Sequence, residues 1–224
     1  MTPVAPVHQH GSSLLEFAIH HGSDLDLRER HFSRGTMLFM PHDDVSSVFV
    51  VRRGRLRVYI PTQGGTDVFL AELGAGDIVG EVSAISGDRQ GTIVEAVEDT
   101  EAYVFTRASF LRVLRECPDG ALEVMRMLCQ RLKTLNQRHI ENVSLPMAAR
   151  LAAELGRLAR ETGDGTLRIE RAPTHADLAG MIGSHREAVT KELRALARAG
   201  VLRVRRGLIE ILKPEALLDR RQPH

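Results

Sequence analysis

Two scarcities restrict what this protein can be: cysteines are few, and long apolar runs are missing. The 224-residue chain has two cysteines, Cys117 and Cys129. They lie in a stretch with a helical pattern, so we expect buried, reduced thiols rather than a disulfide framework or an iron–sulfur cluster, which takes about four ligands. No run of about eighteen apolar residues occurs, and residues 1–11 have no cationic segment leading into an apolar one. We therefore predict a cytoplasmic protein with no membrane partner.

Motifs for enzyme chemistry are also lacking. The sequence has no nucleophile-and-base motif, no metal-ligand spacing and no Walker loop, so neither an enzyme nor a metal site is expected. Net charge is small, at +1, but it is unevenly distributed. Residues 143–213 hold thirteen Lys and Arg against eight Asp and Glu, a net +5, whereas residues 1–142 carry a net −4. A basic C-terminal third favours a polyanion such as nucleic acid as the partner.

The segment 174–200 has the pattern of two short helices joined by a turn. Thr174 with Asp177, and Ser184 with Glu187, each have the spacing of a capping box, so a helix start is predicted after each hydroxyl. Gly183 supplies the conformational freedom that a tight turn between the helices needs. The apolar positions that give each helix one buried face are Leu178, Ile182, Val189, Leu193 and Leu196. This is a helix-turn-helix pattern.

The second of these helices would present side chains that can read a major groove. Arg186 and Lys191 can donate to guanine, and Glu187 can accept from cytosine. The alternative is the solvated face of an ordinary helical hairpin. The residues of this segment that we expect at DNA are Thr174, Ser184, His185, Arg186, Glu187, Thr190 and Lys191.

A basic hairpin is predicted directly after the second helix. Residues 201–212 alternate around Arg206-Gly207, as two short strands joined by a tight turn would. The hairpin carries Arg203, Arg205 and Arg206, which we expect at DNA phosphates. A recognition helix followed by such a hairpin is typical of a winged helix, so double-stranded promoter DNA is the predicted partner.

The first half of the chain has a different pattern, with short apolar segments separated by glycine-containing turns. These segments cover residues 32–39, 47–60, 66–73, 92–96 and 101–105. Regular short strands of this kind predict a small antiparallel barrel or jelly roll. Because such a roll encloses space, a ligand pocket is a candidate feature.

A long helix is predicted between the two halves, from about residue 119 to residue 142. Its side chains repeat at a spacing of three and four residues, which suits pairing with another helix. Packing against the chain's own barrel is the alternative. We favour a parallel homodimer, because a two-fold protein matches a palindromic DNA site. The residues of this seam are Met125, Leu128, Leu132, Leu135 and His139.

The order of these motifs resembles the Crp/Fnr superfamily of bacterial transcription regulators, over residues 14–213. The segments that carry the resemblance are residues 32–36, 53–59, 76–81, 150–152 and 178–187. The resemblance implies an α+β fold with an N-terminal antiparallel β-roll like the cyclic-nucleotide-binding jelly roll, a long dimerisation helix and a C-terminal winged helix-turn-helix. It also makes RNA polymerase a further candidate partner.

The domains that this reading predicts follow the chain in order. They are a flexible tail over residues 1–13, a β-roll effector domain over 14–117, a dimerisation helix over 118–142, a DNA-binding domain over 143–213 and a second tail over 214–224.

The resemblance also implies an effector site that begins at Gly80-Glu81 and continues through Val82 and Ser83. In cyclic-AMP-binding members, a glutamate at this point binds the ribose, and an Arg-Ser pair binds the phosphate. This sequence departs from that pattern, because Gln90 and Gly91 stand at the positions of the pair, and Gln carries no charge.

Other positions of the implied site also differ. Arg89 comes one residue early, which in an extended chain turns its side chain to the opposite face unless a bulge intervenes. Leu135 and Asn136 replace the hydroxyls that face the adenine. We therefore expect cyclic AMP to be disfavoured and the effector to be another small molecule or none. The alternative for Glu81 is an ion pair with a nearby arginine.

The function predicted from these patterns is a sequence-specific DNA-binding transcription regulator that acts as a homodimer. The alternative is a cyclic-nucleotide-responsive regulatory or interaction module without a DNA role.

Overall fold

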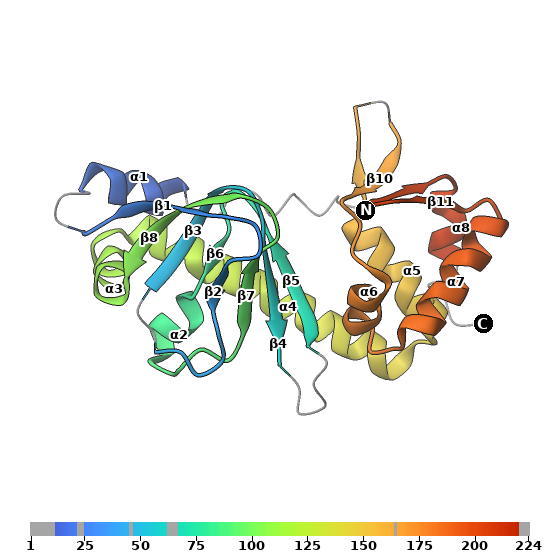
Figure 1. Ribbon diagram of the computed structural model, residues 1–224, viewed down its shortest axis with the longest axis horizontal. Coiled ribbons are helices and arrows are strands. Elements are labelled where there is room, and N and C mark those ends of the chain that lie inside the picture. Colours follow the sequence, from blue (N-terminus) through green and yellow to red (C-terminus); the bar gives the residue numbers. More distant parts are fainter. Residues whose placement is uncertain (1–11, 22–24, 45–46, 62–66, 164, 220–224) are drawn as a thin grey trace. The chain divides into compact units, whose positions relative to one another are not determined.

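The chain forms two compact units in the computed structural model, residues 1–132 and 133–224, here called the roll unit and the winged unit (Figure 1). The structure describes residues 12–21, 25–44, 47–61, 67–163 and 165–219, so the expected N-terminal tail lies outside the described residues up to residue 11. Residues 12 and 13, also assigned to that tail, belong to a helix, α1 (Ser12–His20).

The roll unit contains two four-stranded antiparallel sheets. Their strands are β1 (Arg28–Phe32), β2 (Met37–Phe39), β3 (Ser47–Arg53), β4 (Leu56–Ile60), β5 (Val68–Leu73), β6 (Ile78–Val79), β7 (Ile93–Ala96) and β8 (Thr100–Thr106). One sheet has the order β1-β8-β3-β6 and the other β2-β7-β4-β5. This confirms the antiparallel roll. The expected segment 32–39 is broken at residues 33–36, which separate β1 from β2.

Strand β3 shows how the sequence builds two cores at once. Its side chains alternate between the two faces of the sheet, because successive residues of a strand point in opposite directions. Phe49 and Val51 pack between the two sheets, whereas Val48 and Val50 pack on the outer face of the first sheet. The unbroken apolar run at 48–51 is therefore the pattern of a strand that is buried on both faces.

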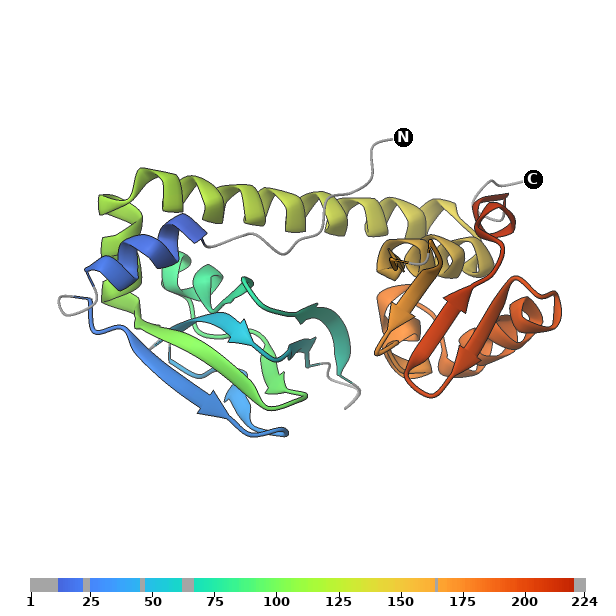
Figure 2. The same cartoon turned by 90° about the horizontal axis from the view of Figure 1, so that it is seen from above.

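Helices cover that outer face. They are α1, α2 (Glu81–Ser86), α3 (Arg107–Glu116) and the first half of α4 (Pro118–Ser144), which Figure 2 shows as one unbroken helix. Leu14, Phe110 and Met127, from α1, α3 and α4, are fully buried in this second core. The long helix was predicted to within two residues, but the helices α1, α2 and α3 were not predicted.

The winged unit combines helices with one small antiparallel sheet of the order β11-β12-β10-β9. Its elements after α4 are α5 (Met147–Leu158), β9 (Arg160–Glu161), β10 (Leu167–Glu170), α6 (His175–Met181), α7 (Arg186–Arg198), β11 (Leu202–Arg205), β12 (Leu208–Ile211) and α8 (Pro214–Asp219). Residues 214–219, expected to be part of a tail, form α8 instead, and Leu217 is buried. Residues 220–224 lie outside the described part of the chain.

The cysteine prediction is half right. Both thiols are free, and Cys117 is buried in the core of the roll unit, but Cys129 is exposed on α4. Among the described residues, no cluster of three His, Cys, Asp or Glu could hold a metal ion. The described helices include none that is long and apolar enough to cross a bilayer.

Candidate nucleic-acid interface

The first helix of the helix-turn-helix begins with the predicted capping box. The Asp177 backbone N–H donates to Thr174 Oγ1 at 3.1 Å, and the Thr174 backbone N–H donates to Asp177 Oδ2 at 3.0 Å. Gly183, with φ of +58°, makes the turn, and the Ser184 N–H donates to the Ala179 carbonyl oxygen at 2.9 Å. All five apolar residues that were predicted to face inward are buried.

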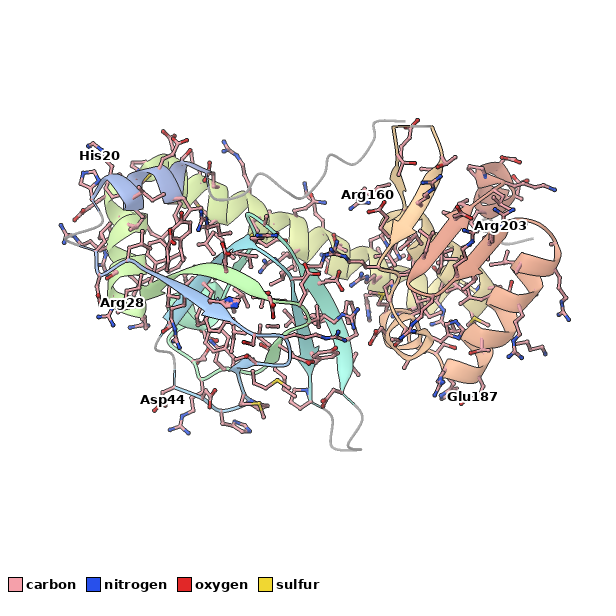
Figure 3. All side chains as sticks on the ribbon, turned by 45° about the horizontal axis from the view of Figure 1, so that its top comes forward. His20, Arg28, Asp44, Arg160, Glu187 and Arg203 are labelled. Atoms are coloured by element: carbon pink, nitrogen blue, oxygen red, sulfur yellow. The ribbon has the colours of Figure 1, made fainter. Side chains whose placement is uncertain are left out.

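The second helix starts differently from the prediction. Helix α7 has His185 as its N-cap, and no side chain caps its first N–H groups. The expected capping box of Ser184 with Glu187 is therefore wrong. As a result, the Glu187 carboxylate is exposed and projects from the first turn of α7, as Figure 3 shows. The N-terminal N–H groups of α7 are also left without a side-chain acceptor.

A shallow groove follows the outer face of α7. It is lined by Arg186, Glu187, Thr190, Lys191, Arg194 and Arg198. The first four belong to the predicted DNA contacts, and the structure brings them together on one face. Arg194 and Arg198 were not predicted, although they continue the i, i+4 row of Arg186 and Thr190, and this spacing could have identified them.

The hydroxyl of Thr190 is engaged on both sides. Thr190 Oγ1 donates to the Arg186 carbonyl oxygen at 2.8 Å, and His175 Nδ1 lies 2.8 Å from Thr190 Oγ1. His175 was not among the predicted DNA contacts. No sequence signal marks this pair, because the two residues lie on different helices and are fifteen positions apart.

The wing is the predicted hairpin, with Leu202 paired to Ile211 and Arg205 to Leu208. Gly207, the second of the two turn residues, has φ of +71°, a left-handed conformation that favours glycine at that position. Arg205 and Arg206 are exposed at the tip. Arg203, in contrast, makes an ion pair with Glu210 on the neighbouring strand, with Nη1 3.3 Å from Oε2. Its charge is thus partly neutralised within the wing.

A buried ionic network holds the helices behind this surface together. The fully buried Glu154 of α5 accepts from Arg138 Nη2 and Arg157 Nη2, each at 2.7 Å, and Arg157 also donates to Glu141. Burial alone would lower the pKa of Arg157, but its hydrogen bonds to Glu141 and its pairing with Glu154 outweigh burial and raise it. The network joins the second half of α4 to α5 within the winged unit.

At the implied effector site of the roll unit, the buried carboxylate already has a partner within the protein. Glu81 is buried at the start of α2 and accepts from Arg131 Nη1 at 2.5 Å, and Arg131 Nη2 donates to the Ile78 carbonyl oxygen at 2.7 Å. Burial raises the pKa of Glu81, and the Arg131 charge offsets only part of that effect. Arg131 was not predicted at this site, because it follows Glu81 by fifty positions.

The backbone before α2 explains why Gly80 is a glycine. Its φ is +90°, and a Cβ there would come within 2.7 Å of the Ser47 carbonyl oxygen and 2.9 Å of the Phe39 ring. Gly80 therefore has a structural role at a tight crossing of chain segments.

Gln90, which stands at the arginine position of the missing Arg-Ser pair, is also bound within the protein. Gln90 is 4% exposed and accepts from Ser83 Oγ at 3.1 Å, while its Nε2 has no hydrogen-bond partner among the described residues. Arg89 points away, with its side chain 69% exposed beside Asp44, which Figure 3 shows on the loop after β2. Val82 is also largely exposed, so it does not line an interior pocket.

The exposed face of α4 overlaps only in part with the predicted seam. Leu128 is half-buried against the core of the roll unit, whereas its neighbour Cys129 is exposed. Leu135 and Asn136 are exposed as well. The exposed positions at a spacing of three and four, here called the α4 stripe, are Leu122, Met125, Cys129, Leu132, Asn136, His139 and Val143. Met125, Leu132 and His139 of the predicted seam belong to this stripe, and Leu128 does not.

Comparison with known proteins assigns both halves of the chain. A family model described as a cyclic nucleotide-binding domain matches residues 29–117, and one described as a Crp-like helix-turn-helix domain matches residues 149–220. Over 193 residues the chain is 32% identical to the cyclic AMP receptor protein of Thermus thermophilus, covering 86% of this chain and 87% of that protein.

Solved structures share the fold over nearly the whole chain. A CooA mutant from Carboxydothermus hydrogenoformans superposes with a TM-score of 0.78 at 24% identity, covering 96% of this chain and 99% of that one. A CRP/FNR-family transcriptional regulator from Thermus thermophilus gives a TM-score of 0.64 at 24% identity, covering 87% and 98%.

Proposed function

The chain belongs to the Crp/Fnr family of DNA-binding transcription regulators, and from this premise we propose that it binds a palindromic promoter site as a homodimer without cyclic AMP as its activator. The observation that carries the DNA part of the proposal is the outer face of α7, where Arg186, Glu187 and Lys191 stand together at the groove. An arginine can bind the O6 and N7 atoms of guanine with two hydrogen bonds, and a carboxylate can accept from the cytosine amino group.

The α4 stripe supports the homodimer. Leu132 is 58% exposed and Met125 51% exposed, on a face of the helix beside the residues that enter the core of the roll unit. Apolar side chains repeated at three and four residues are the pattern by which two helices pair in parallel. A two-fold pair would present two copies of α7 to the half-sites of a palindrome, about 34 Å apart.

The roll unit supports the absence of an ordinary cyclic-AMP response. Glu81, which would bind a ribose hydroxyl, is already held by Arg131, and neither Gln90 nor Gly91 can neutralise a phosphate. A cyclic nucleotide would lose a charge-assisted hydrogen bond, worth about 1.5–3 kcal/mol. The free amide Nε2 of Gln90 leaves one donor for the acceptor of a different, uncharged ligand or for a water.

Binding-site selection tests the DNA part directly. Wild-type protein is incubated with random duplexes without any added nucleotide, and the recovered sequences are aligned. We expect a palindrome, and we expect its affinity to fall steeply as salt rises, because phosphate contacts release counterions. Recovery of no common sequence would contradict sequence-specific binding, and an asymmetric half-site would contradict the homodimer. RNA polymerase is a further partner that we propose for the promoter-bound protein.

A further inference from the structure

The hydroxyl of Thr190 cannot serve as a donor to a DNA base. Its single proton lies between Oγ1 and the Arg186 carbonyl oxygen, which are 2.8 Å apart. A carbonyl oxygen only accepts hydrogen bonds, so the proton on this contact has to come from the hydroxyl. Thr190 was predicted to contact DNA, but this bond makes its oxygen an acceptor, and the acceptor faces His175.

The same bond fixes which nitrogen of His175 carries a proton. Nδ1 of His175 lies 2.8 Å from Thr190 Oγ1. Because the hydroxyl proton is committed to Arg186, Nδ1 must carry a proton and donate it to Oγ1. A neutral imidazole has one N–H group, so its other nitrogen, Nε2, is then a bare acceptor. Such a nitrogen cannot donate to an anion.

We propose that His175 contacts a DNA phosphate, and that this contact forms only when Nε2 takes up a proton. DNA binding by the winged unit would therefore be coupled to protonation of this one side chain. The proposal rests on the DNA-binding function described above. It adds a contact outside the recognition helix, and it makes Thr190 a positioning residue that orients the imidazole.

The location of His175 supports a phosphate rather than a base as the ligand. It is the first residue of α6 and reaches α7 at Thr190, which lines the groove. A bare Nε2 would repel a phosphate oxygen, whereas an imidazolium donates a charge-assisted hydrogen bond and adds one positive charge.

Charged side chains occur both on the neighbouring groove of α7 and on α6. Those that line the groove on α7 are Arg186, Glu187, Lys191, Arg194 and Arg198. On α6, Asp177 accepts from the Thr174 backbone N–H. The groove is thus positive on balance, with four basic side chains and one acidic one, which suits a phosphate.

Fluorescence anisotropy at several pH values tests the proposal. The probes are a duplex of roughly 30 base pairs that carries the palindrome selected by the wild-type protein, and a mixed-sequence duplex of the same length, both at constant ionic strength. We expect wild-type affinity for both duplexes to fall about tenfold or more between about pH 6 and about pH 8, because a phosphate contact acts on every sequence.

Three variants separate His175 from other groups that titrate. His175→Arg should bind as tightly at about pH 8 as the wild type does at about pH 6, with a flat profile, because its charge is permanent. His175→Gln should bind weakly with a flat profile. His31→Gln, which alters an exposed histidine of β1 in the roll unit, should keep the wild-type slope. Thermal melting of each variant checks that the winged unit stays folded.

The outcomes distinguish a phosphate contact by His175 from a purely structural role of His175, and both of these from a protein that does not bind DNA. A merely structural bond to Thr190 would weaken both His175 variants at every pH without flattening the slope, and this would overturn the proposal. A flat wild-type profile would overturn it as well. Tight binding by His175→Arg at every pH would still support the DNA-binding function, whereas no binding by any variant would contradict both.

The tautomer can also be measured without DNA. Nitrogen-15 NMR of the free protein, with His175 assigned by comparison with His175→Gln, should show the proton on Nδ1 above neutral pH. A proton on Nε2 under these conditions would overturn the proposal, because that tautomer could donate to a phosphate without taking up a proton.

Discussion

The two places where this protein gathers polar groups of functional interest are built in opposite ways. In the roll unit, each charged residue of the implied effector site has a partner elsewhere in the protein: the buried Glu81 pairs with Arg131, and the exposed Arg89 pairs with Asp44. On the outer face of α7, the side chains of Arg186, Glu187 and Lys191 make no ion pair with any residue that the structure describes.

This difference teaches where an external ligand can bind at low cost. A ligand that needs the buried Glu81 has to compete with Arg131, which donates to both the Glu81 carboxylate and the Ile78 carbonyl oxygen, and removing one partner of a buried pair is costly. An exposed and unpaired charge is already solvated, so binding exchanges water and counterions for phosphate or base contacts. We therefore expect the winged unit to bind its partner more readily than the implied effector site binds a nucleotide.

The largest expected effect comes from breaking the α4 stripe, because the proposed DNA site is read by two copies of α7. Leu132→Asp changes a residue of the stripe, and Leu135→Asp changes an exposed leucine of the predicted seam beside it, so the two carboxylates lie at and next to the stripe. We expect a loss of about 3 kcal/mol or more per dimer, since the facing carboxylates are desolvated and repel each other. Sedimentation should show a monomer, and anisotropy should show lost operator binding.

Lys133→Asp is the matched control for that variant. It introduces the same side chain between the two leucines, at an exposed polar position outside the α4 stripe. It should remain a dimer. If the double variant also remained a dimer of unchanged stability, the stripe would not be the interface.

A smaller effect should follow from changes at the implied effector site. Gln90→Arg with Gly91→Ser restores the phosphate-binding pair, and a Cβ at Gly91 would meet no atom within 4 Å, so the serine fits. We expect the pair to gain about one to two orders of magnitude in cyclic-AMP affinity, measured by calorimetry. Gly91→Ser alone is the control. No gain would mean that the pairing of Glu81 with Arg131 or the residues Leu135 and Asn136 keep the site closed.

On the outer face of α7, Glu187→Ala should change the sequence specificity of DNA binding more than its affinity. The carboxylate is exposed and is proposed to accept from one cytosine amino group in each half-site, a contact worth about 1–3 kcal/mol of discrimination. Binding-site selection with the variant should return a palindrome that is relaxed at one symmetric position, with unchanged non-specific binding. An unchanged preference would show that Glu187 does not read a base.

The smallest effect concerns the stability of the roll unit. Burial raises the pKa of Glu81 in the folded protein above its ordinary value of 4.5, so the folded state favours the protonated carboxyl. The ionised form therefore costs stability at neutral pH, and this cost should disappear as the pH falls through the raised pKa toward 4.5. Relative to Glu81→Gln, the wild type should gain unfolding free energy over this range in chemical denaturation. A relative loss of stability on acidification would contradict this assignment.

Much of the fold could be predicted from the sequence because capping residues, turn glycines and apolar spacing all indicated the same helices and turns. The capping box at Thr174, the positive φ at Gly183 and the buried apolar face of α7 all specify the helix-turn-helix from nearby residues. The unpredicted helices α2 and α8 have six residues each, too few to show a helical period.

The prediction and the structure differ where packing between distant segments determines which side chains are buried and which residues meet. Leu128 and Cys129 both fit a spacing of three and four, and only the packing of α4 on the roll places Leu128 inward. The contact of Arg131 with Glu81 spans fifty positions, so no motif contains both. His185 replaced Ser184 as the N-cap, a shift of one residue that frees the carboxylate of Glu187.

The central claim, that the winged unit binds its partner more readily than the implied effector site binds a nucleotide, is tested most directly by one titration. The selected palindromic duplex is titrated with wild-type protein in the absence and in the presence of saturating cyclic AMP, and anisotropy gives the two dissociation constants. The claim predicts the same tight binding in both, within about twofold. Binding that appears only with cyclic AMP, or that tightens by about tenfold or more, would contradict it.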